Sequence, residues 1–173
     1  MKIALTGTPG VGKTGVANEL EKKGYSLLRI EEIADNFVIG YDNERESKIV
    51  DEEKMDEYIK KIEEKDKILI IEGHLSHLMS VDGVIILRCH PSELKKRLEK
   101  KKWNEKKIKE NLEAEALDII LQRALERHKK IWEIDTTGKK LDEVVEEVEE
   151  ILKKLPPPLY GKLDYSEWLI ENA

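Results

Sequence analysis

The hydrophobic pattern divides the chain into short apolar runs and longer amphipathic segments. The run from Ile68 to Ile71 is unbroken, as expected of a parallel strand that is buried on both faces. Runs of this kind predict strands at 2–6, 25–30, 67–72, 83–88 and 131–135. Because these strands alternate with helical segments, we expect an α/β domain with a mainly parallel sheet. Ligands of such sheets bind at the carboxyl ends of the strands.

Apolar residues at helical spacing mark most of the segments between the strands. Helices are predicted over 14–20, over 51–64, from Pro91 onward, from about Asn104 to about Lys130, and over 141–155. The polar segment 31–50 carries turn residues at Gly40 and Asp42, and is predicted to be mobile.

The end of the chain begins with Pro156, Pro157 and Pro158, which stop the last predicted helix. The tail through Ala173 then contains large apolar side chains, at Leu159, Tyr160, Leu163, Tyr165, Trp168 and Leu169. A tail this apolar is expected to pack on the domain's own surface, with binding to a partner protein as the alternative.

Length and charge limit the classes of function. A chain of 173 residues suits one domain, and its net charge of −6 argues against a broad nucleic-acid-binding face, although it would suit a basic protein partner. Cys89 is the only cysteine, so no intrachain disulfide can form and a cytoplasmic location is expected. We expect Cys89 to be a structural residue at a strand end. The sequence contains no signal peptide and no apolar run long enough to cross a membrane.

The stretch Gly7-Thr8-Pro9-Gly10-Val11-Gly12-Lys13-Thr14 fits the phosphate-loop pattern at every fixed position. A predicted strand precedes it and a predicted helix follows it, which is the context that the motif requires. Backbone N–H groups of such a loop form an anion site at a helix N-terminus. Lys13 would place a positive charge over the β- and γ-phosphates, and the Thr14 hydroxyl could ligate Mg²⁺. The alternative is an ordinary glycine-rich turn with an incidental lysine.

An acidic side chain near the magnesium is the second requirement of this chemistry. Glu72 ends an apolar strand, so we expect it beside the phosphate loop, where it could order a magnesium-bound water. His74 could orient water or a phosphate oxygen. The alternatives are a solvated strand-end charge for Glu72 and a surface histidine for His74.

Phosphoryl transfer also needs cations that close over the transferred group. Arg88, Arg97 and Lys101 lie on or after the fourth strand and are the candidates. The polar stretch that follows, 104–111, could move as a lid.

These motifs together resemble the adenylate kinase isoenzyme six subfamily of the nucleoside monophosphate kinases. The resemblance covers about residues 1–154 and depends on GTPGVGKT at 7–14, IVDEEKMDEYI at 49–59, IIEGH at 70–74, RLEKKKWNEKKIKENL at 97–112 and IDTTGK at 134–139. Members of this subfamily are small nuclear and archaeal ATPases tied to maturation of the small ribosomal subunit.

The resemblance implies a three-layer α/β/α P-loop fold with a five-stranded parallel sheet, and ATP and Mg²⁺ as cofactors. It implies a kinase domain, predicted over 1–155, with a monophosphate-binding segment at about 30–53 and a lid at about 100–110. The tail at 156–173, which begins with the prolines, lies outside the resemblance. Arg97 would lie near the adenine, Lys101 would take the place of the lid arginine, and Thr137 and Gly138 would lie beside the base. The implied phosphate contacts are Gly7, Pro9, Gly10, Val11, Gly12, Lys13, Thr14 and Gly15.

The sequence departs from the family at the lid. Lys101 and Lys102 stand where eukaryotic members have Arg-Gly. A lysine lacks the bidentate guanidinium of arginine, which stabilises the charge of the transition state. Three functions are therefore considered. The first is an AMP kinase with ATPase activity that also binds the small-subunit ribosomal protein uS11. The second is an assembly factor whose binding to that partner is controlled by ATP. The third is a kinase of another small metabolite.

Overall fold

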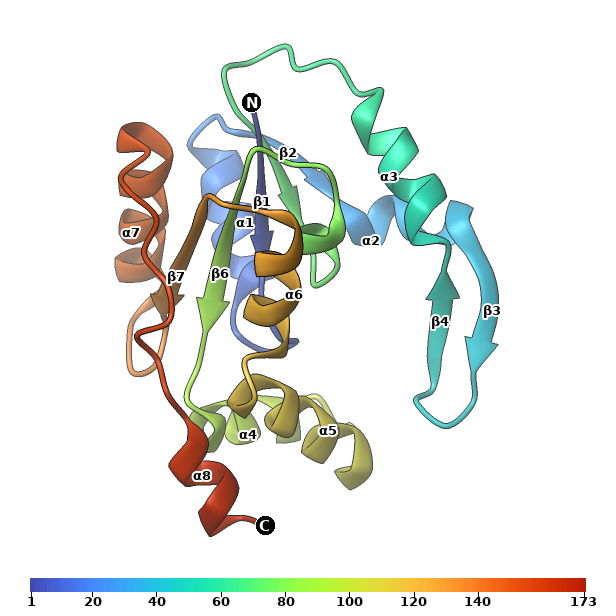
Figure 1. The fold of residues 1–173 in the computed structure, drawn as a ribbon, viewed down its shortest axis with the longest axis vertical. Helices are drawn as coiled ribbons and strands as arrows, with labels where there is room; N and C mark the ends of the chain where they lie inside the picture. The colour runs from blue at the N-terminus through green and yellow to red at the C-terminus, as the bar shows by residue number, and fades with distance from the viewer.

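The computed structural model describes residues 1–173 and shows a five-stranded parallel sheet at the centre of the molecule (Figure 1). The strand order is β2-β5-β1-β6-β7, and every neighbouring pair is parallel. The strands are β1 Lys2–Thr6, β2 Ser26–Arg29, β5 Leu69–Glu72, β6 Gly83–Arg88 and β7 Ile131–Asp135. The predicted fold class is confirmed, and each strand lies within its predicted range.

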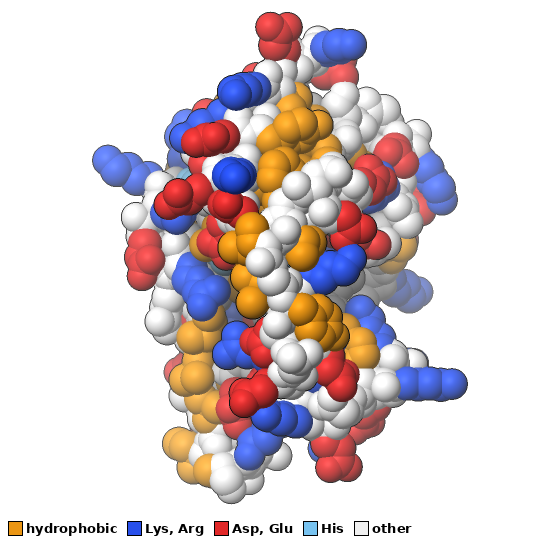
Figure 2. All heavy atoms as spheres, turned by 90° about the vertical axis from the view of Figure 1, so that its right-hand side faces the viewer, with side chains coloured by type: hydrophobic (Ala, Val, Ile, Leu, Met, Phe, Trp, Pro, Cys, Tyr) orange, Lys and Arg blue, Asp and Glu red, His pale blue; other side chains and the backbone are white.

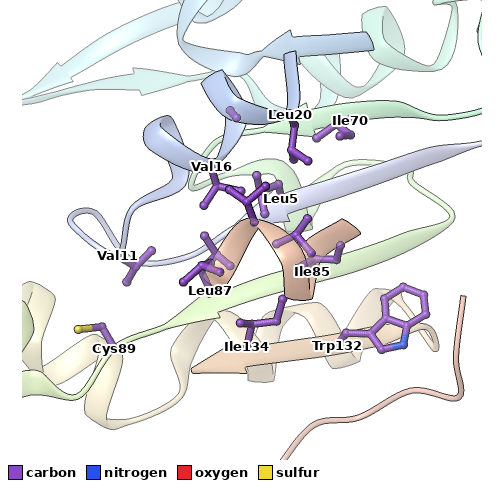
Figure 3. Close-up of a cluster of buried hydrophobic side chains, with 14 of the residues drawn as sticks. Leu5, Val11, Val16, Leu20, Ile70, Ile85, Leu87, Cys89, Trp132 and Ile134 are labelled. Atoms are coloured by element: carbon purple, nitrogen blue, oxygen red, sulfur yellow. The ribbon is translucent and has the colours of Figure 1, made fainter. Parts of the chain in front are cut away.

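Helices cover both faces of the sheet because side chains on successive strand residues point to opposite sides. Ile3 and Leu5 of β1 pack against α1 Lys13–Lys22 and α7 Leu141–Lys154. Ala4, between them, packs on the other side against α6 Ile119–Arg127. Figure 3 shows the first of these cores, in which Leu5, Ile85 and Ile134 from three strands meet Val16 and Leu20 of α1. The result is the predicted three-layer arrangement.

Residues 31–50, predicted as a mobile segment, instead form short helices and a hairpin. These are α2 Ile30–Ile33, the 3₁₀ helix Ala34–Phe37, β3 Val38–Asp42 and β4 Ser47–Val50. The Asp42 carboxylate accepts the backbone N–H groups of Glu44 and Arg45 and so closes the hairpin turn. Helix α3, Glu52–Lys60, follows and is capped by Asp51. The hairpin stands beside the main sheet (Figure 1) and forms a separate two-stranded sheet.

The long helix predicted from about Asn104 to about Lys130 is wrong, since two helices occupy this range. Helix α5, Glu105–Ala116, starts at the predicted Asn104 cap, and α6 starts only at Ile119. Between them Asp118 adopts a left-handed conformation with φ of 55°. The Arg88 guanidinium bonds both the Glu115 carbonyl (2.9 Å) and the Asp118 carboxylate (2.6 Å) at this break. A buried side chain from another element therefore sets the break, and local periodicity does not reveal it.

The tail packs on the domain, as predicted. Leu159 exchanges backbone hydrogen bonds with β7, through Ile131 (3.0 Å) and Glu133 (2.8 Å). Helix α8, Ser166–Glu171, then lies beside α5 and near α4, Pro91–Glu99 (Figure 1). Tyr165 is 7% exposed and faces the Arg88 guanidinium. None of the helices is long and apolar enough to cross a membrane.

Two tyrosines of the tail test this packing. Tyr165→Ala should lower the free energy of unfolding by about 3 kcal/mol, because it empties a buried aromatic site. Tyr160→Ala is the matched control, since Tyr160 is 42% exposed, and its effect should stay within about 0.5 kcal/mol. Urea denaturation followed by circular dichroism measures both. Equal effects of the two substitutions would contradict the packing described here.

Candidate active site

The phosphate loop joins β1 to α1 and is shaped by glycine at two points. Gly12 precedes the first turn of α1 with φ of 109°, a conformation that side chains rarely adopt. A Cβ atom on Gly7 would lie 2.7 Å from the Leu87 carbonyl oxygen, so only glycine lets the loop approach β6 this closely. The loop thus brings its backbone N–H groups to the N-terminus of α1, where an anion is favoured.

Val11 fastens the loop to the core. Its side chain is buried and points into the same interior as Leu87 and Val16 (Figure 3). Its backbone N–H donates to the Thr8 carbonyl at 3.2 Å. Core packing and this hydrogen bond therefore fix the conformation of the loop, as a preorganised phosphate site requires.

Lys13 lies across the loop with its ammonium group directed at the loop's own carbonyl groups. Its Nζ donates to the carbonyl oxygens of Gly7 (2.6 Å) and Thr8 (3.2 Å). Burial lowers the pKa of Lys13 to about 8, although the Glu72 carboxylate opposes that shift. The ammonium is thus mostly charged at pH 7, and it loses its proton as the pH rises through about 8.

A cavity of about 770 Å³ opens at the carboxyl ends of β1 and β5. The phosphate-loop residues that line it are Pro9, Gly10, Gly12, Lys13 and Thr14. Glu72 and His74 line it from the end of β5, and Lys101 lines it from the segment between α4 and α5. Eight of the predicted site residues thus meet in one space.

The hairpin forms the opposite wall of the cavity. It contributes two cations, Arg45 and Lys48, which the sequence indicated only as part of the segment 30–53. Each is paired with a nearby carboxylate: Lys48 with Asp35 at 2.5 Å, and Arg45 with Asp42 at 3.9 Å. Cations thus line the cavity from both the phosphate loop and the hairpin, and on the hairpin side the paired carboxylates of Asp35 and Asp42 line it as well.

Glu72 is the buried acid of the site. It is 6% exposed, and burial raises the pKa of its carboxyl group while the Lys13 ammonium opposes that rise. No cluster of three His, Cys, Asp or Glu side chains could hold a metal ion. The Thr14 hydroxyl and the Glu72 carboxylate, which line the same cavity, are hard oxygen donors. They suit Mg²⁺ that takes its other ligands from phosphates and water.

Six predicted residues lie outside the lining of this cavity: Gly7, Val11, Gly15, Arg97, Thr137 and Gly138. Gly7 and Val11 support the loop as described, and Gly15 lies in α1 beside Leu141.

Arg97, Thr137 and Gly138 form a group at the edge of the phosphate loop, and the Glu93 side chain connects two of them. The Glu93 carboxylate accepts from the Arg97 guanidinium (2.6 Å) and from the Gly138 N–H (3.1 Å). Arg97 also donates to the Val11 carbonyl at 3.2 Å. The Thr137 hydroxyl accepts the His90 N–H at 2.8 Å. The structure thus places Arg97, Thr137 and Gly138 near one another, at the edge of the phosphate loop.

Arg88 is a correction to the sequence analysis. It is 1% exposed, and Glu115, Asp118 and Glu133 pair with it, so its guanidinium is not available to a phosphate. Glu115 is itself buried and accepts the Thr8 hydroxyl at 3.0 Å, a contact that the sequence did not indicate. Cys89 follows Arg88 and is buried, and burial raises the pKa of its thiol to about 12, which fits the predicted structural role.

Comparison with known proteins identifies the family. A family model described as "AAA domain" matches residues 3–118, more than half of the chain. The chain is 45% identical over 153 residues to an Archaeoglobus fulgidus protein named "Putative adenylate kinase", which covers 88% of this chain and 83% of that protein. A Methanocaldococcus jannaschii protein of the same name is 41% identical over 156 residues, with 88% and 86% covered. The chain belongs to this archaeal adenylate kinase-like family.

Solved structures agree on the fold of this adenylate kinase-like family. A thymidylate kinase from Candida albicans matches with a TM-score of 0.57 at 14% identity, and the match covers 89% of this chain and 91% of that one. A deoxyadenosine kinase from M. mycoides matches with a TM-score of 0.57 at 19% identity, covering 90% and 100%. At these identities the likeness shows the fold alone. Family membership confirms the resemblance drawn from the motifs and makes the protein a nucleotide-binding P-loop kinase.

The charge of Lys13 gives a pH prediction. Because its pKa is about 8, the lysine is charged below that pH and neutral above it, so ADP binding should weaken by about tenfold between pH 7 and pH 9. Isothermal titration calorimetry with ADP measures the affinity without turnover. Lys13→Ala is the control and should bind weakly, with no step across this range. Equal pH slopes for the two proteins would show that Lys13 does not supply the titrating charge.

Proposed function

We propose that this protein transfers a phosphoryl group from ATP to AMP and so forms two molecules of ADP. The observation that carries the proposal is that cations line the cavity from two elements, Lys13 from the phosphate loop and Arg45 with Lys48 from the hairpin, where a phosphate could replace their carboxylate partners. A site that only hydrolysed ATP would need the first of these elements alone. A volume of about 770 Å³ lies within the usual range of ligand pockets, toward its upper end.

The phosphate loop would hold the donor nucleotide. Lys13 now bonds the carbonyl oxygens of Gly7 and Thr8, and phosphate oxygens would replace them. Gly7, Pro9, Gly10, Val11, Gly12, Thr14 and Gly15 are the other proposed loop contacts, either directly or as support. Arg97, Thr137 and Gly138 would hold the adenine end beside the loop.

Glu72 and Thr14 would hold Mg²⁺ through their oxygen atoms. When bound, Mg²⁺ would neutralise charge on the β- and γ-phosphates. Glu72 must be ionised for this role. The adjacent Lys13 ammonium favours the ionised form, against the effect of burial.

The hairpin cations would take the acceptor phosphate. Lys48 and Arg45 are already paired with Asp35 and Asp42, so an incoming phosphate must compete with these carboxylates. Such an exchange costs little because both pairs lie at exposed sites. Lys101 would approach the transferred group from the lid segment, as a point charge. Residues 30–53 would then be the monophosphate-binding segment and 100–110 the lid of a 1–155 kinase domain, with 156–173 as an added tail.

A second activity, hydrolysis of ATP, is favoured by His74. Its imidazole is exposed on the cavity wall near Lys13 and Glu72, where it could orient a water molecule. The resemblance to ribosome-maturation ATPases then supports a role in small-subunit maturation and rRNA processing in the cytoplasm, with uS11 as partner. The net charge of −6 suits a basic partner of this kind. On the face shown in Figure 2, acidic and basic side chains are interspersed, which favours a protein partner over a broad nucleic-acid contact.

A nucleotide panel with product analysis tests the proposed reaction. ATP is incubated with each nucleoside monophosphate in turn, with and without uS11, and products are separated by anion-exchange chromatography. The expected result is ADP formed in a two-to-one ratio to the AMP consumed. Phosphate released only in the presence of uS11, with no dependence on AMP, would instead support the switched assembly factor.

The hairpin cations give a prediction about binding of the acceptor. Lys48→Ala and Arg45→Ala should each raise the KM for AMP by about tenfold, since each removes a charged hydrogen-bond donor. The affinity for ATP, measured by calorimetry, should not change. Lys54→Ala is the matched control, because Lys54 is an exposed lysine of α3 that does not line the cavity. If neither wall variant differs from the control in KM, the hairpin does not bind the acceptor.

A further inference from the structure

Glu115 is a buried carboxylate that the proposed reaction does not use directly. It is 2% exposed, and it lies in the last turn of α5, the helix whose first half belongs to the proposed lid segment. One carboxylate oxygen accepts the Thr8 hydroxyl at 3.0 Å. The other accepts the Arg88 Nε–H at 3.2 Å and the Cys89 N–H at 2.8 Å. A single side chain thus joins the phosphate loop, the end of β6 and the lid helix.

Thr8 connects this carboxylate to the nucleotide side of the loop. Its hydroxyl is bonded to Glu115, while its carbonyl accepts from Lys13 Nζ at 3.2 Å and from the Val11 N–H. When a phosphate draws Lys13 away, the Thr8 carbonyl loses the lysine, but its hydroxyl remains tied to Glu115. Thr8 therefore contacts both the lysine that a phosphate would draw away and the buried carboxylate at the end of α5.

The opposite end of α5 lies beside the lid residues. Helix α5 starts at Glu105, directly after Trp103 and Asn104, and the Lys107 ammonium lies 4.0 Å from the centre of the Trp103 ring. Lys101 Nζ lies 5.3 Å from the same ring. Because a helix is a rigid element, a displacement of its Glu115 end would also displace the residues around Trp103.

We propose that Glu115 is a positioning residue that transmits nucleotide binding at the phosphate loop to the lid. It bonds the Thr8 hydroxyl of the phosphate loop, and its contact with Arg88 fixes the C-terminal end of α5. The inference rests on the proposed function for the meaning of the lid, but the link itself requires only that a nucleotide binds the loop.

Fluorine NMR tests the link without any turnover. The chain has three tryptophans, so protein labelled with 5-fluorotryptophan gives one resonance each for Trp103, Trp132 and Trp168. Trp103→Phe assigns the lid resonance. The Trp132 resonance reports an intact core, because Trp132 is buried beside β6. ADP is added to saturation, as judged by calorimetry on the same sample.

In the unmodified protein ADP should shift the Trp103 resonance. Thr8→Val keeps the shape of the side chain and removes its hydroxyl, and Glu115→Gln removes the charge. Each should reduce the shift at saturation by more than half and weaken ADP binding by about fivefold. The double variant should lose less affinity than the sum of the two single losses, because the Thr8–Glu115 hydrogen bond is affected in both single variants. Thr8→Ser, which keeps the hydroxyl, should restore the shift.

Glu113→Gln is the matched control on the same helix, since Glu113 makes only a surface pair with Lys109. It should behave like the unmodified protein. Should Glu115→Gln fail to fold, as a changed Trp132 resonance would show, Thr8→Val alone decides the question. A full Trp103 shift in Thr8→Val, or additive losses of affinity in the double variant, would overturn the proposal. If ADP binds and shifts Trp103 but AMP is never phosphorylated, the proposed reaction fails while this link stands.

Discussion

The ion pairs of Arg88 hold together the parts of the molecule that form the site. The guanidinium is buried at the end of β6 and contacts Glu115 of α5, Asp118 at the helix break and Glu133 of β7. The ring of Tyr165 from the tail lies 5.3 Å from it. Removing one partner of a buried charge network costs several kcal/mol, because it leaves an uncompensated charge in the interior. This one side chain thus sets the break between α5 and α6, and it contributes to the packing of the tail through Tyr165 and to the support of the phosphate loop through Glu115.

The location of the site follows from this arrangement. Strands β1 and β5 end side by side, so the loop after β1 and Glu72 at the end of β5 face the same space. The short elements after β2 carry the hairpin to the opposite side, where it supplies Arg45 and Lys48. The five-stranded sheet thus positions the phosphate loop, while the hairpin that we propose to bind the acceptor forms a separate two-stranded sheet. Fixed donor contacts and a separately placed acceptor site are what transfer between two nucleotides needs.

The sequence predicted the sheet and the loop well, because both depend on local patterns. Unbroken apolar runs identified the strands, and the loop motif placed Lys13 and Thr14 beside Glu72. It missed features that depend on contacts between distant residues. Asp118 breaks a helix because Arg88 binds it, 30 residues away in the chain. Glu115 resembles its half-exposed neighbour Glu113 in the sequence, and only the buried contacts of Glu115 with Thr8, Arg88 and Cys89 distinguish the two. The hairpin was missed because its short strands are mostly exposed and lack a clear apolar alternation.

We propose that one cavity holds a donor nucleotide at the phosphate loop and an acceptor nucleotide at the hairpin. A crystal structure with a dinucleoside pentaphosphate, in which one phosphate chain joins two adenosines, tests it most directly. The phosphate chain is expected to run from Lys13, past Glu72, to Arg45 and Lys48, with the hairpin cations released from Asp42 and Asp35. A structure in which the phosphate loop holds one adenosine end, while the other projects into solvent and the hairpin pairs stay intact, would contradict it.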